Sequence, residues 1–344
     1  MIKSSDIEPL SSTGIGSLPH RDSVAALDLA CGMDIPYFPT LPQVDFHEGI
    51  LFQALGGFPG IFWKTGGKPF FELAAWERGR EVLAERLGRA FLPDPNQEVG
   101  LAASEGLWRM FLERLQGHPG SWAKVQLLGP VTAALSIPGL DHLAPSLAMD
   151  LVAQVSEWLL SKALSLVADL GRAGKRAMFF WDEPALATPE VLQPMARLAA
   201  EQLRERIEVL KNFGAVVGIH CCGHWNFGEQ LPWPQHIVSL DWSLSGDPLL
   251  KESGKLREFR SRGGRLALGL VPTRLPSTWN SRQEVEQCRT RFEAAFGQEE
   301  ARAFLGESLL TPACGLGLRT LPDCAAVFSA LRECQEYLRD YVRA

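Results

Sequence analysis

Histidine and cysteine residues stand close together at one point of the sequence, and another cysteine follows much later. The run His220–His224 reads His-Cys-Cys-Gly-His and ends a short apolar stretch, while Cys314 ends another. Imidazole nitrogen and thiolate sulfur are the ligands that Zn²⁺ prefers, and a catalytic zinc site keeps one position open for substrate. Residues two apart in a strand face the same side, so His220 and Cys222 can reach one ion while Cys221 points away. These residues predict a zinc site, and the alternative is a buried histidine among small buried cysteines.

Carboxylates end two further apolar stretches. Asp182 and Glu183 end one of them, and Asp241 ends the other. The turn at Pro184 would present the first two carboxylates at the edge where the thiols gather, although they could instead only cap the helix that follows. His224 is a rival zinc ligand, but we expect it to face solvent because it follows a glycine in a loop.

Short apolar stretches alternate with longer amphipathic ones along the chain. This alternation is typical of parallel strands joined by crossover helices. Eight such stretches match the strand count of a (β/α)₈ TIM barrel, whose functional residues gather at the carboxyl ends of the strands. An open, doubly wound sheet is the alternative. The predicted strands are Thr13–Leu18, Ile35–Thr40, Ala123–Leu128, Arg176–Asp182, Ala215–His220, His236–Trp242, Arg265–Val271 and Leu309–Cys314.

One connection is too long for an ordinary loop between two barrel strands. The segment Pro42–Gly120 follows the second predicted strand and contains two helical patterns, Leu73–Phe91 and Glu98–Leu115. We therefore expect a single domain over residues 1–344, in which this helical insertion covers part of the barrel mouth.

Composition and charge exclude several classes of protein. The 344 residues are 46% hydrophobic and carry a formal net charge of −6, with no basic stripe, so we expect no nucleic-acid partner. The first residues contain no apolar signal region, and no stretch approaches the roughly 20 uncharged apolar residues of a membrane helix. Seven cysteines form an odd set in a chain too large to need disulfides. We expect a cytoplasmic protein with reduced thiols and no membrane contact.

Five short motifs resemble, in the same order, the C-terminal catalytic domain of cobalamin-independent methionine synthase. That family belongs to a superfamily shared with uroporphyrinogen decarboxylase and corrinoid-linked methyltransferases. The resemblance extends over nearly the whole chain and implies a TIM barrel, a catalytic zinc and methyl transfer to a thiol. The motifs are Thr13–Pro19 (TGIGSLP), Leu128–Thr132 (LGPVT), Asp182–Leu186 (DEPAL), His220–Cys222 (HCC) and Pro312–Leu316 (PACGL).

The resemblance assigns the metal ligands residue by residue. The zinc ligands of the family fall on His220, Cys222 and Cys314, and its glutamate ligand falls on Asp241. Aspartate has a shorter reach than glutamate, so Asp241 either binds the ion directly, acts through a water or leaves the position to the substrate thiol.

The resemblance also assigns substrate contacts. Ile15, Gly16 and Ser17 match the segment that contacts the substrate, and its backbone amides can hold a carboxylate, since glycine permits close backbone approach. Asp182 matches the aspartate that binds the substrate ammonium, and we place its neighbour Glu183 in the same substrate-binding set. The residues expected to carry catalysis are Asp182, His220, Cys222 and Cys314.

Two features differ from the long methionine synthases. The chain begins a few residues before the first motif, so a folate-binding half is not found, and the Gly-Glu-Pro-Glu-Arg segment with the second substrate carboxylate is missing. Pro39–Gly49 and Gly56–Gly60 instead look like the shorter, single-barrel relatives, and Glu48 is a weak substitute for the missing carboxylate. We therefore expect a methyl donor other than folate polyglutamate, such as a methylated corrinoid protein.

The function expected from these features is methyl transfer to a small thiol, with homocysteine converted to methionine. Coenzyme M or another thiol is an alternative acceptor. A decarboxylase of the uroporphyrinogen type is a rival, but it would need an Arg-rich N-terminal segment where this chain has only Arg21. A protein that binds a thiol or corrinoid without turnover is a third possibility.

Residues near the predicted zinc ligands extend this expectation. The tryptophans Trp181, Trp225 and Trp242 flank the ligands and can form an apolar wall that positions a methyl carrier. Thr273 and Arg274 follow the seventh predicted strand, where they can bind a phosphate or carboxylate. The alternatives are a plain apolar core and a solvated loop.

Overall fold

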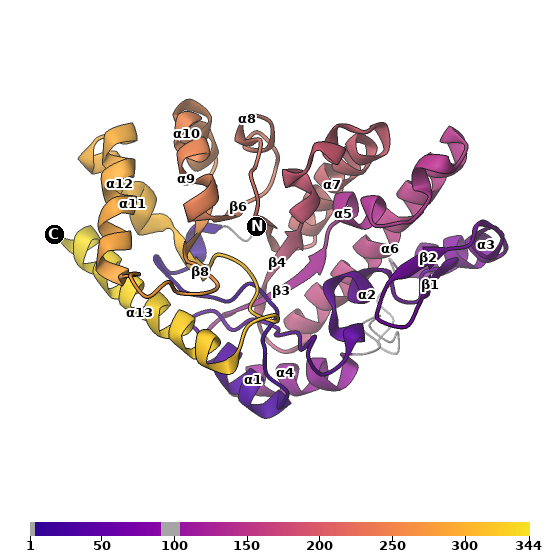
Figure 1. The fold of residues 1–344 in the computed structure, drawn as a ribbon, viewed down its shortest axis with the longest axis horizontal. Coiled ribbons are helices and arrows are strands. Elements are labelled where there is room, and N and C mark those ends of the chain that lie inside the picture. The colour runs from indigo at the N-terminus through magenta and orange to yellow at the C-terminus, as the bar shows by residue number, and fades with distance from the viewer. Residues whose placement is uncertain (1–3, 91–103) are drawn as a thin grey trace.

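The computed structural model describes residues 4–90 and 104–344, and its centre is a curled sheet of six parallel strands (Figure 1). These strands pair in sequence order, from β3 to β8. They confirm six of the eight predicted strands, with ends that differ by at most two residues. Their bounds are β3 Trp122–Leu128, β4 Arg176–Asp182, β5 Val216–Cys221, β6 Ile237–Asp241, β7 Arg265–Val271 and β8 Leu309–Pro312.

Helices cover the outer face of this sheet, as the apolar strands require. β3 and β7 are buried along their whole length, which is typical of parallel strands with both faces covered. The helix α6 packs on β3 and β4, α7 packs on β5, and α13 packs on β7 and β8. The helices are α1 Ser23–Cys31, α2 Ile50–Leu55, α3 Leu73–Ala90, α4 Glu105–Gly117, α5 Pro130–Leu135, α6 Pro145–Arg172, α7 Pro194–Asn212, α8 Phe227–Gln230, α9 Trp242–Lys251, α10 Ser253–Ser261, α11 Ser281–Phe296, α12 Gln298–Glu307 and α13 Leu321–Arg343. Short 3₁₀ turns lie at Ser4–Asp6, Phe46–Glu48, Leu140–His142, Pro184–Ala187 and Pro189–Leu192.

The first two predicted strands, 13–18 and 35–40, are not regular strands. Single parallel bridges join Ser12 to Leu310 of β8, Ser17 to Thr40, and Tyr37 to Lys124 of β3. The pairing does not extend into ladders because two glycines interrupt the first segment and two prolines, which have no N–H to donate, interrupt the second. The two segments nevertheless connect β8 to β3, so the described sheet is a curled half barrel with irregular chain between its edges.

An apolar cluster fills the interior of the sheet near the amino ends of its strands. Phe180 and Met178 of β4 belong to this cluster together with Val216 and Ile237 of the next two strands. A Cβ at Gly218 would lie 2.4 Å from the Phe180 ring, so only glycine allows that ring to lie across β5. The amino end of the sheet is thus packed, and the carboxyl end remains for a site.

The insertion contains α2, α3, α4 and a two-stranded hairpin, β1 Ile61–Trp63 and β2 Pro69–Phe71. α3 and the hairpin lie on the side of the molecule away from α11–α13, and α4 lies beside α1 (Figure 1). α3 begins at the predicted Leu73. Phe91 and residues 98–103 of the two predicted helical patterns lie outside the described residues, and α4 begins at Glu105.

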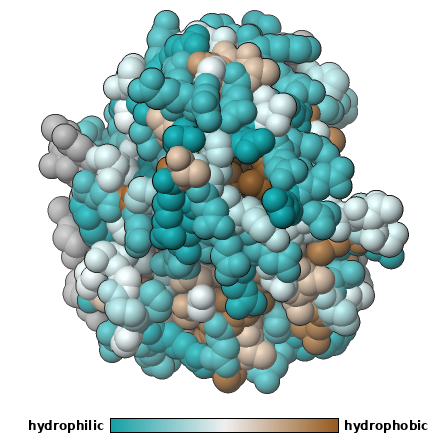
Figure 2. All heavy atoms as spheres, turned by 90° about the vertical axis from the view of Figure 1, so that its left-hand side faces the viewer, coloured by the Kyte–Doolittle hydropathy of each residue, from teal (hydrophilic) through white to brown (hydrophobic). Residues whose placement is uncertain are grey.

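The helix α6 is long and apolar enough to cross a membrane by length and composition alone, contrary to the expectation from the sequence. However, 67% of its most apolar window is buried inside the protein, because the helix packs between the sheet and its neighbours. This burial is typical of a core helix. The side of the molecule that carries α11–α13 exposes mostly hydrophilic residues (Figure 2).

Candidate metal and substrate site

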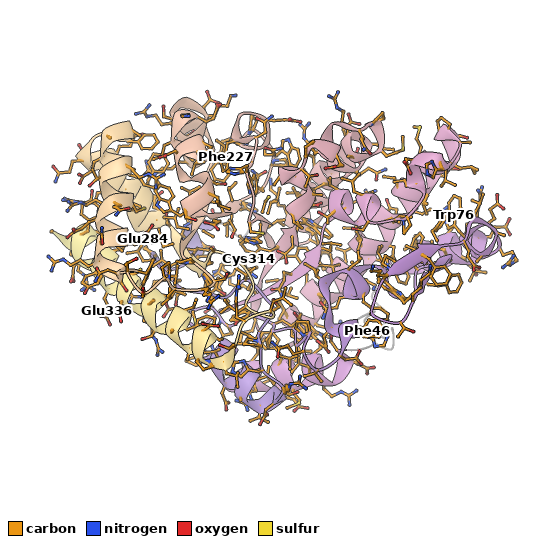
Figure 3. The ribbon with its side chains drawn as sticks, in the orientation of Figure 1. Phe46, Trp76, Phe227, Glu284, Cys314 and Glu336 are labelled. Carbon is orange, nitrogen blue, oxygen red and sulfur yellow. The ribbon has the colours of Figure 1, made fainter. Side chains whose placement is uncertain are left out.

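The three predicted zinc ligands lie together at the carboxyl end of the sheet. The ligand atoms of His220, Cys222 and Cys314 are all within 4.8 Å of one another. His220 lies in β5, Cys222 directly follows this strand, and Cys314 follows β8. Cys314 lies near the middle of the molecule (Figure 3). Two strands far apart in the sequence therefore bring one nitrogen and two sulfurs to a single point.

The His220 ring is arranged as a metal ligand would be. Its Nδ1 lies 3.0 Å from the Ser239 hydroxyl of β6, and its Nε2 is buried without a hydrogen-bond partner. Metal-binding histidines commonly use their second nitrogen in a hydrogen bond that fixes the ring. A buried nitrogen without a partner costs stability unless a ligand satisfies it. This orphaned atom and the sulfur-rich donor set fit a zinc ion.

The thiols of Cys222 and Cys314 differ in pKa. The hydrogen bond from the Cys314 thiol, and then the neighbouring His220 ring, lower the pKa of Cys222 to about 4. The same hydrogen bond, together with burial, raises the pKa of Cys314, because Cys314 holds the shared proton. A sulfur with a lowered pKa next to an imidazole is a suitable environment for a cation.

The neighbouring candidates do not join this group. Cys221 is fully buried, burial raises its pKa to about 12, and its carbonyl oxygen accepts a 2.7 Å hydrogen bond from Trp225 Nε1. His224 is exposed. The alternation along β5 thus directs His220 and Cys222 to one side and Cys221 into the core.

Asp241 is likewise not brought into the group. Its Oδ1 accepts hydrogen bonds from the Ser243 amide at 2.9 Å and the Ser243 hydroxyl at 2.7 Å, so it caps the amino end of α9. A short aspartate used as a helix cap has its oxygen directed along the chain. A direct metal bond from Asp241 stays a prediction, and the geometry of the described residues gives it no support.

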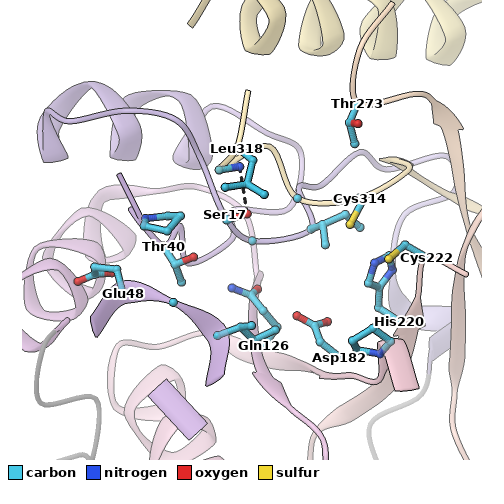
Figure 4. Close-up of a pocket in the computed structure, with 18 of the residues that line it drawn as sticks. Ser17, Thr40, Glu48, Gln126, Asp182, His220, Cys222, Thr273, Cys314 and Leu318 are labelled. Carbon is cyan, nitrogen blue, oxygen red and sulfur yellow. Dashed lines mark hydrogen bonds between the residues drawn. The ribbon is translucent and has the colours of Figure 1, made fainter. Parts of the chain in front are cut away.

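A cavity of about 460 Å³ lies beside the ligand atoms (Figure 4). His220, Cys222, Cys314 and Asp182 face it from one side, and Glu48 lies on the opposite side. The full set of lining residues combines strand ends, the Ile15–Ser17 segment, the insertion and the loop after β8. They are Ile15, Gly16, Ser17, Thr40, Pro42, Glu48, Gly49, Ile50, Gln53, Gln126, Asp182, Pro184, His220, Cys222, Thr273, Cys314, Gly315, Gly317, Leu318 and Arg319.

Asp182 brings a negative charge into this cavity. Its side chain is only 5% exposed, and its Oδ1 has no hydrogen-bond partner. Burial raises the pKa of Asp182 to about 6, against the opposing influence of His220 and Lys124. The unpartnered Oδ1 is available to a cationic group of a ligand.

The Ile15–Ser17 segment is supported from β3 by two polar residues that sequence reasoning missed. Lys124 Nζ donates to the Ile15 carbonyl at 2.7 Å and to Gln126 Oε1 at 2.9 Å, and burial lowers the pKa of Lys124 to about 8. A Cβ on Gly16 would lie 2.8 Å from Gln126 Nε2, so a larger residue there would push this amide from its 2.9 Å hydrogen bond to the Phe38 carbonyl. Lysine and glutamine inside an apolar strand are the signal that marks such support.

Glu183 has a structural contact in place of the predicted substrate contact. It is fully buried and does not line the cavity. Its carboxylate accepts hydrogen bonds from Val131 N at 2.9 Å, Thr132 N at 2.8 Å and Thr132 Oγ1 at 2.6 Å, at the amino end of α5. Glu183 therefore caps a helix, as the alternative prediction stated. The helix is α5, however, and not the helix that follows Glu183 in the sequence.

Replacing Glu183 by glutamine is expected to destabilise the fold without removing the metal. A glutamine has one acceptor oxygen for three donors and would face them with an N–H group, at a cost of about 1–3 kcal/mol. Thermal unfolding of Glu183→Gln should show a lower Tm, and the exposed Glu336→Gln serves as the control. Equal Tm values for the two variants would refute the capping role.

The predicted aromatic wall is wrong. Trp181 and Trp242 are fully buried, Trp225 is 5% exposed, and none of the three lines the cavity. Their flat rings fill the core between strands and helices, as when Trp242 stacks on Phe292 at 5.3 Å.

Of the two predicted anion-binding residues, only Thr273 lines the cavity, while Arg274 is exposed outside it. Glu48 is buried at the cavity wall, where burial raises its pKa and its Oε2 lies 3.4 Å from Leu41 N. Its place in the lining supports the predicted substitute role.

Comparison with known proteins gives a fold relationship. No family model and no curated protein matches this sequence. A solved structure of a B12-independent methionine synthase from Shewanella sp. W3-18-1, in complex with selenomethionine, matches with a TM-score of 0.63 at 16% identity. The match covers 96% of this chain and 98% of that one. This chain has the fold of that methionine synthase. The predicted resemblance to the family is therefore confirmed at the level of fold.

Proposed function

We propose that this chain is a zinc-dependent methyltransferase that moves a methyl group to a small thiol, with homocysteine as acceptor and methionine as product. The observation that carries the proposal is the group His220, Cys222 and Cys314, which opens into a cavity beside the unpartnered Asp182. The fold likeness to a methionine synthase solved with selenomethionine supports the choice of acceptor.

His220, Cys222 and Cys314 would hold the zinc, and Asp241 or a water is the remaining candidate ligand. A bound zinc supplies one effect, the stabilisation of a coordinated thiol as its thiolate at neutral pH. Asp182 would bind the acceptor ammonium, and the backbone of Ile15–Ser17 its carboxylate. The cavity walls orient the sulfur toward the methyl group and exclude water, and such positioning lowers the barrier by several kcal/mol.

The proposed donor is a methylated corrinoid protein. The fold match covers 96% of this chain and 98% of the methionine synthase chain, and the residues that this chain offers for the reaction are the thiol-activating group His220, Cys222 and Cys314. Leu318 is 91% exposed and Ile50 41% exposed where they line the cavity. Apolar side chains at the mouth suit a transient protein donor, whose docking surfaces are modest and partly apolar.

The proposal includes the domain organisation of the chain. We assign residues 1–344 to one domain in which the irregular segments before β3 close a TIM barrel and the insertion 42–120 covers part of its mouth. Five insertion residues in the cavity lining support this role, namely Pro42, Glu48, Gly49, Ile50 and Gln53. The same proposal makes the protein cytoplasmic, without nucleic-acid or membrane partners.

The charges of the residues that line the cavity argue against a uroporphyrinogen-type decarboxylase. A uroporphyrinogen-type decarboxylase must hold several substrate carboxylates, and among the lining residues Arg319 alone is a lysine or arginine. Coenzyme M remains the alternative acceptor if Asp182 binds no substrate ammonium.

The test supplies purified protein with zinc, homocysteine and either methylcobalamin, a methylcorrinoid protein or methyltetrahydrofolate triglutamate, and measures methionine. We expect methionine from a corrinoid donor and none from the folate. Turnover with the folate alone would refute the proposed donor. No turnover with any donor would leave a different thiol or a non-catalytic binding protein.

A further inference from the structure

One positively charged side chain, Arg319, lines the cavity from the loop after β8. The negative charges among the lining residues are Asp182 and Glu48. A ligand in this cavity therefore meets carboxylates on one side and a single guanidinium on another.

The guanidinium of Arg319 is held by a neutral partner. Thr273 Oγ1 accepts hydrogen bonds from Arg319 Nε at 3.2 Å and from Arg319 Nη2 at 2.8 Å. Arg319 is one of the groups that lower the pKa of the nearby Asp323, but the Asp323 carboxylate accepts a 2.7 Å hydrogen bond from Thr320 Oγ1, and no salt bridge joins Arg319 to a carboxylate within residues 4–90 and 104–344. The threonine orients the guanidinium without neutralising its charge, which leaves donors for an anion.

The backbone fixes this arginine relative to the candidate ligand-binding residues. The loop that begins at Cys314 is tied to Ser17, since Leu316 N donates to the Ser17 carbonyl at 2.8 Å and Gly317 N to Ser17 Oγ at 3.1 Å (Figure 4). Gln43 Nε2 donates to the Arg319 carbonyl at 3.1 Å. A ligand whose sulfur lies at Cys314 therefore extends along a fixed loop that ends at Arg319.

We propose that Arg319, together with the Ile15–Ser17 backbone, binds the carboxylate of the acceptor amino acid and thereby selects amino-acid thiols over thiols without a carboxylate. The inference rests on the proposed function and adds a specificity-determining residue to it. A zwitterionic acceptor needs one anionic and one cationic partner, and the cavity offers Asp182, the carboxylate on the side of the sulfurs (Figure 4), and Arg319. Planar guanidinium groups bind carboxylates with two parallel hydrogen bonds.

The experiment measures binding by calorimetry on the zinc-loaded full chain. The probes are L-homocysteine and 3-aminopropane-1-thiol, which is the same molecule without its carboxylate. Arg319→Gln should weaken homocysteine binding about 10- to 100-fold, the range for a lost hydrogen bond to a charged group, and change binding of the aminothiol less than about twofold. Arg282→Gln, an exposed arginine on α11, should bind both probes as the wild type does.

Each outcome separates this inference from the proposed function. If wild-type protein binds both thiols and Arg319→Gln weakens them equally or not at all, the assignment of Arg319 is wrong and the proposed function stands. If wild-type protein binds neither thiol, the proposed function and this inference fail together. A circular dichroism spectrum of Arg319→Gln equal to that of the wild type shows that the loss is not one of folding.

Discussion

Replacing Cys314 by serine is expected to lower zinc affinity by well over 100-fold. Loss of a residue that only orients a metal ligand costs roughly 10- to 100-fold, and here a thiolate ligand itself is lost. The Cys314 sulfur is one of three ligand atoms that lie within 4.8 Å of one another, and the Cys222 sulfur is another. Cys222→Ser should therefore show a similar loss, measured by competition with a chromophoric zinc chelator.

A matched control for these variants lies next to Cys222. Cys221 is buried on the other side of the same strand and faces the core, so Cys221→Ala should keep its zinc even where its stability is reduced. Full retention of zinc by both Cys222→Ser and Cys314→Ser would refute the metal centre. Loss of zinc in the control as well would point to general unfolding.

Replacing Asp182 by asparagine is expected to weaken binding of the acceptor by about 1.5–3 kcal/mol while zinc is retained. This is the range for a hydrogen bond to a charged group, and the buried Asp182 Oδ1 has no other partner in the described structure. Calorimetry with L-homocysteine measures the loss. A thiol that lacks the ammonium, 4-mercaptobutanoate, should bind the variant and the wild type with similar affinity.

The exposed Asp141→Asn is the control for this substitution and should bind homocysteine normally. If Asp182→Asn loses its zinc, Asp182 contributes to the metal site, contrary to the division of roles proposed here. If it binds homocysteine as tightly as the wild type, the ammonium is held elsewhere, and Glu48 is then the next candidate.

The strands that are continuous apolar runs could be predicted from the sequence alone. Arg176–Asp182 and Arg265–Val271 have the predicted bounds because their residues are buried on both faces of a parallel sheet. The segments 13–18 and 35–40 could not be recognised as irregular, because single bridges depend on where β8 and β3 come to lie. Local patterns specify an extended segment but not whether its neighbours complete a ladder.

The candidate site was predictable where chemistry and periodicity coincide. The spacing of His220 and Cys222 places both on one side of β5, and the structure brings Cys314 to them. The roles of Ser239 and Arg319 could not be predicted, because each acts through a contact with a residue distant in sequence.

The reverse error concerns Glu183, where sequence adjacency to Asp182 suggested a shared role. Successive residues at a strand end point in opposite directions, so Asp182 faces the cavity and Glu183 faces α5. The same alternation that identified the metal ligands thus explains why its neighbour belongs to the scaffold.

The most direct test of the central claim is the number of protons released when homocysteine binds to the zinc-loaded protein at neutral pH. Calorimetric titration in buffers of different ionisation enthalpy measures this number. We predict release of about one proton per thiol bound, because a thiol coordinates a metal as its thiolate. Binding without proton release, or equal release by the Cys314→Ser variant, would contradict activation of the acceptor thiol at His220, Cys222 and Cys314.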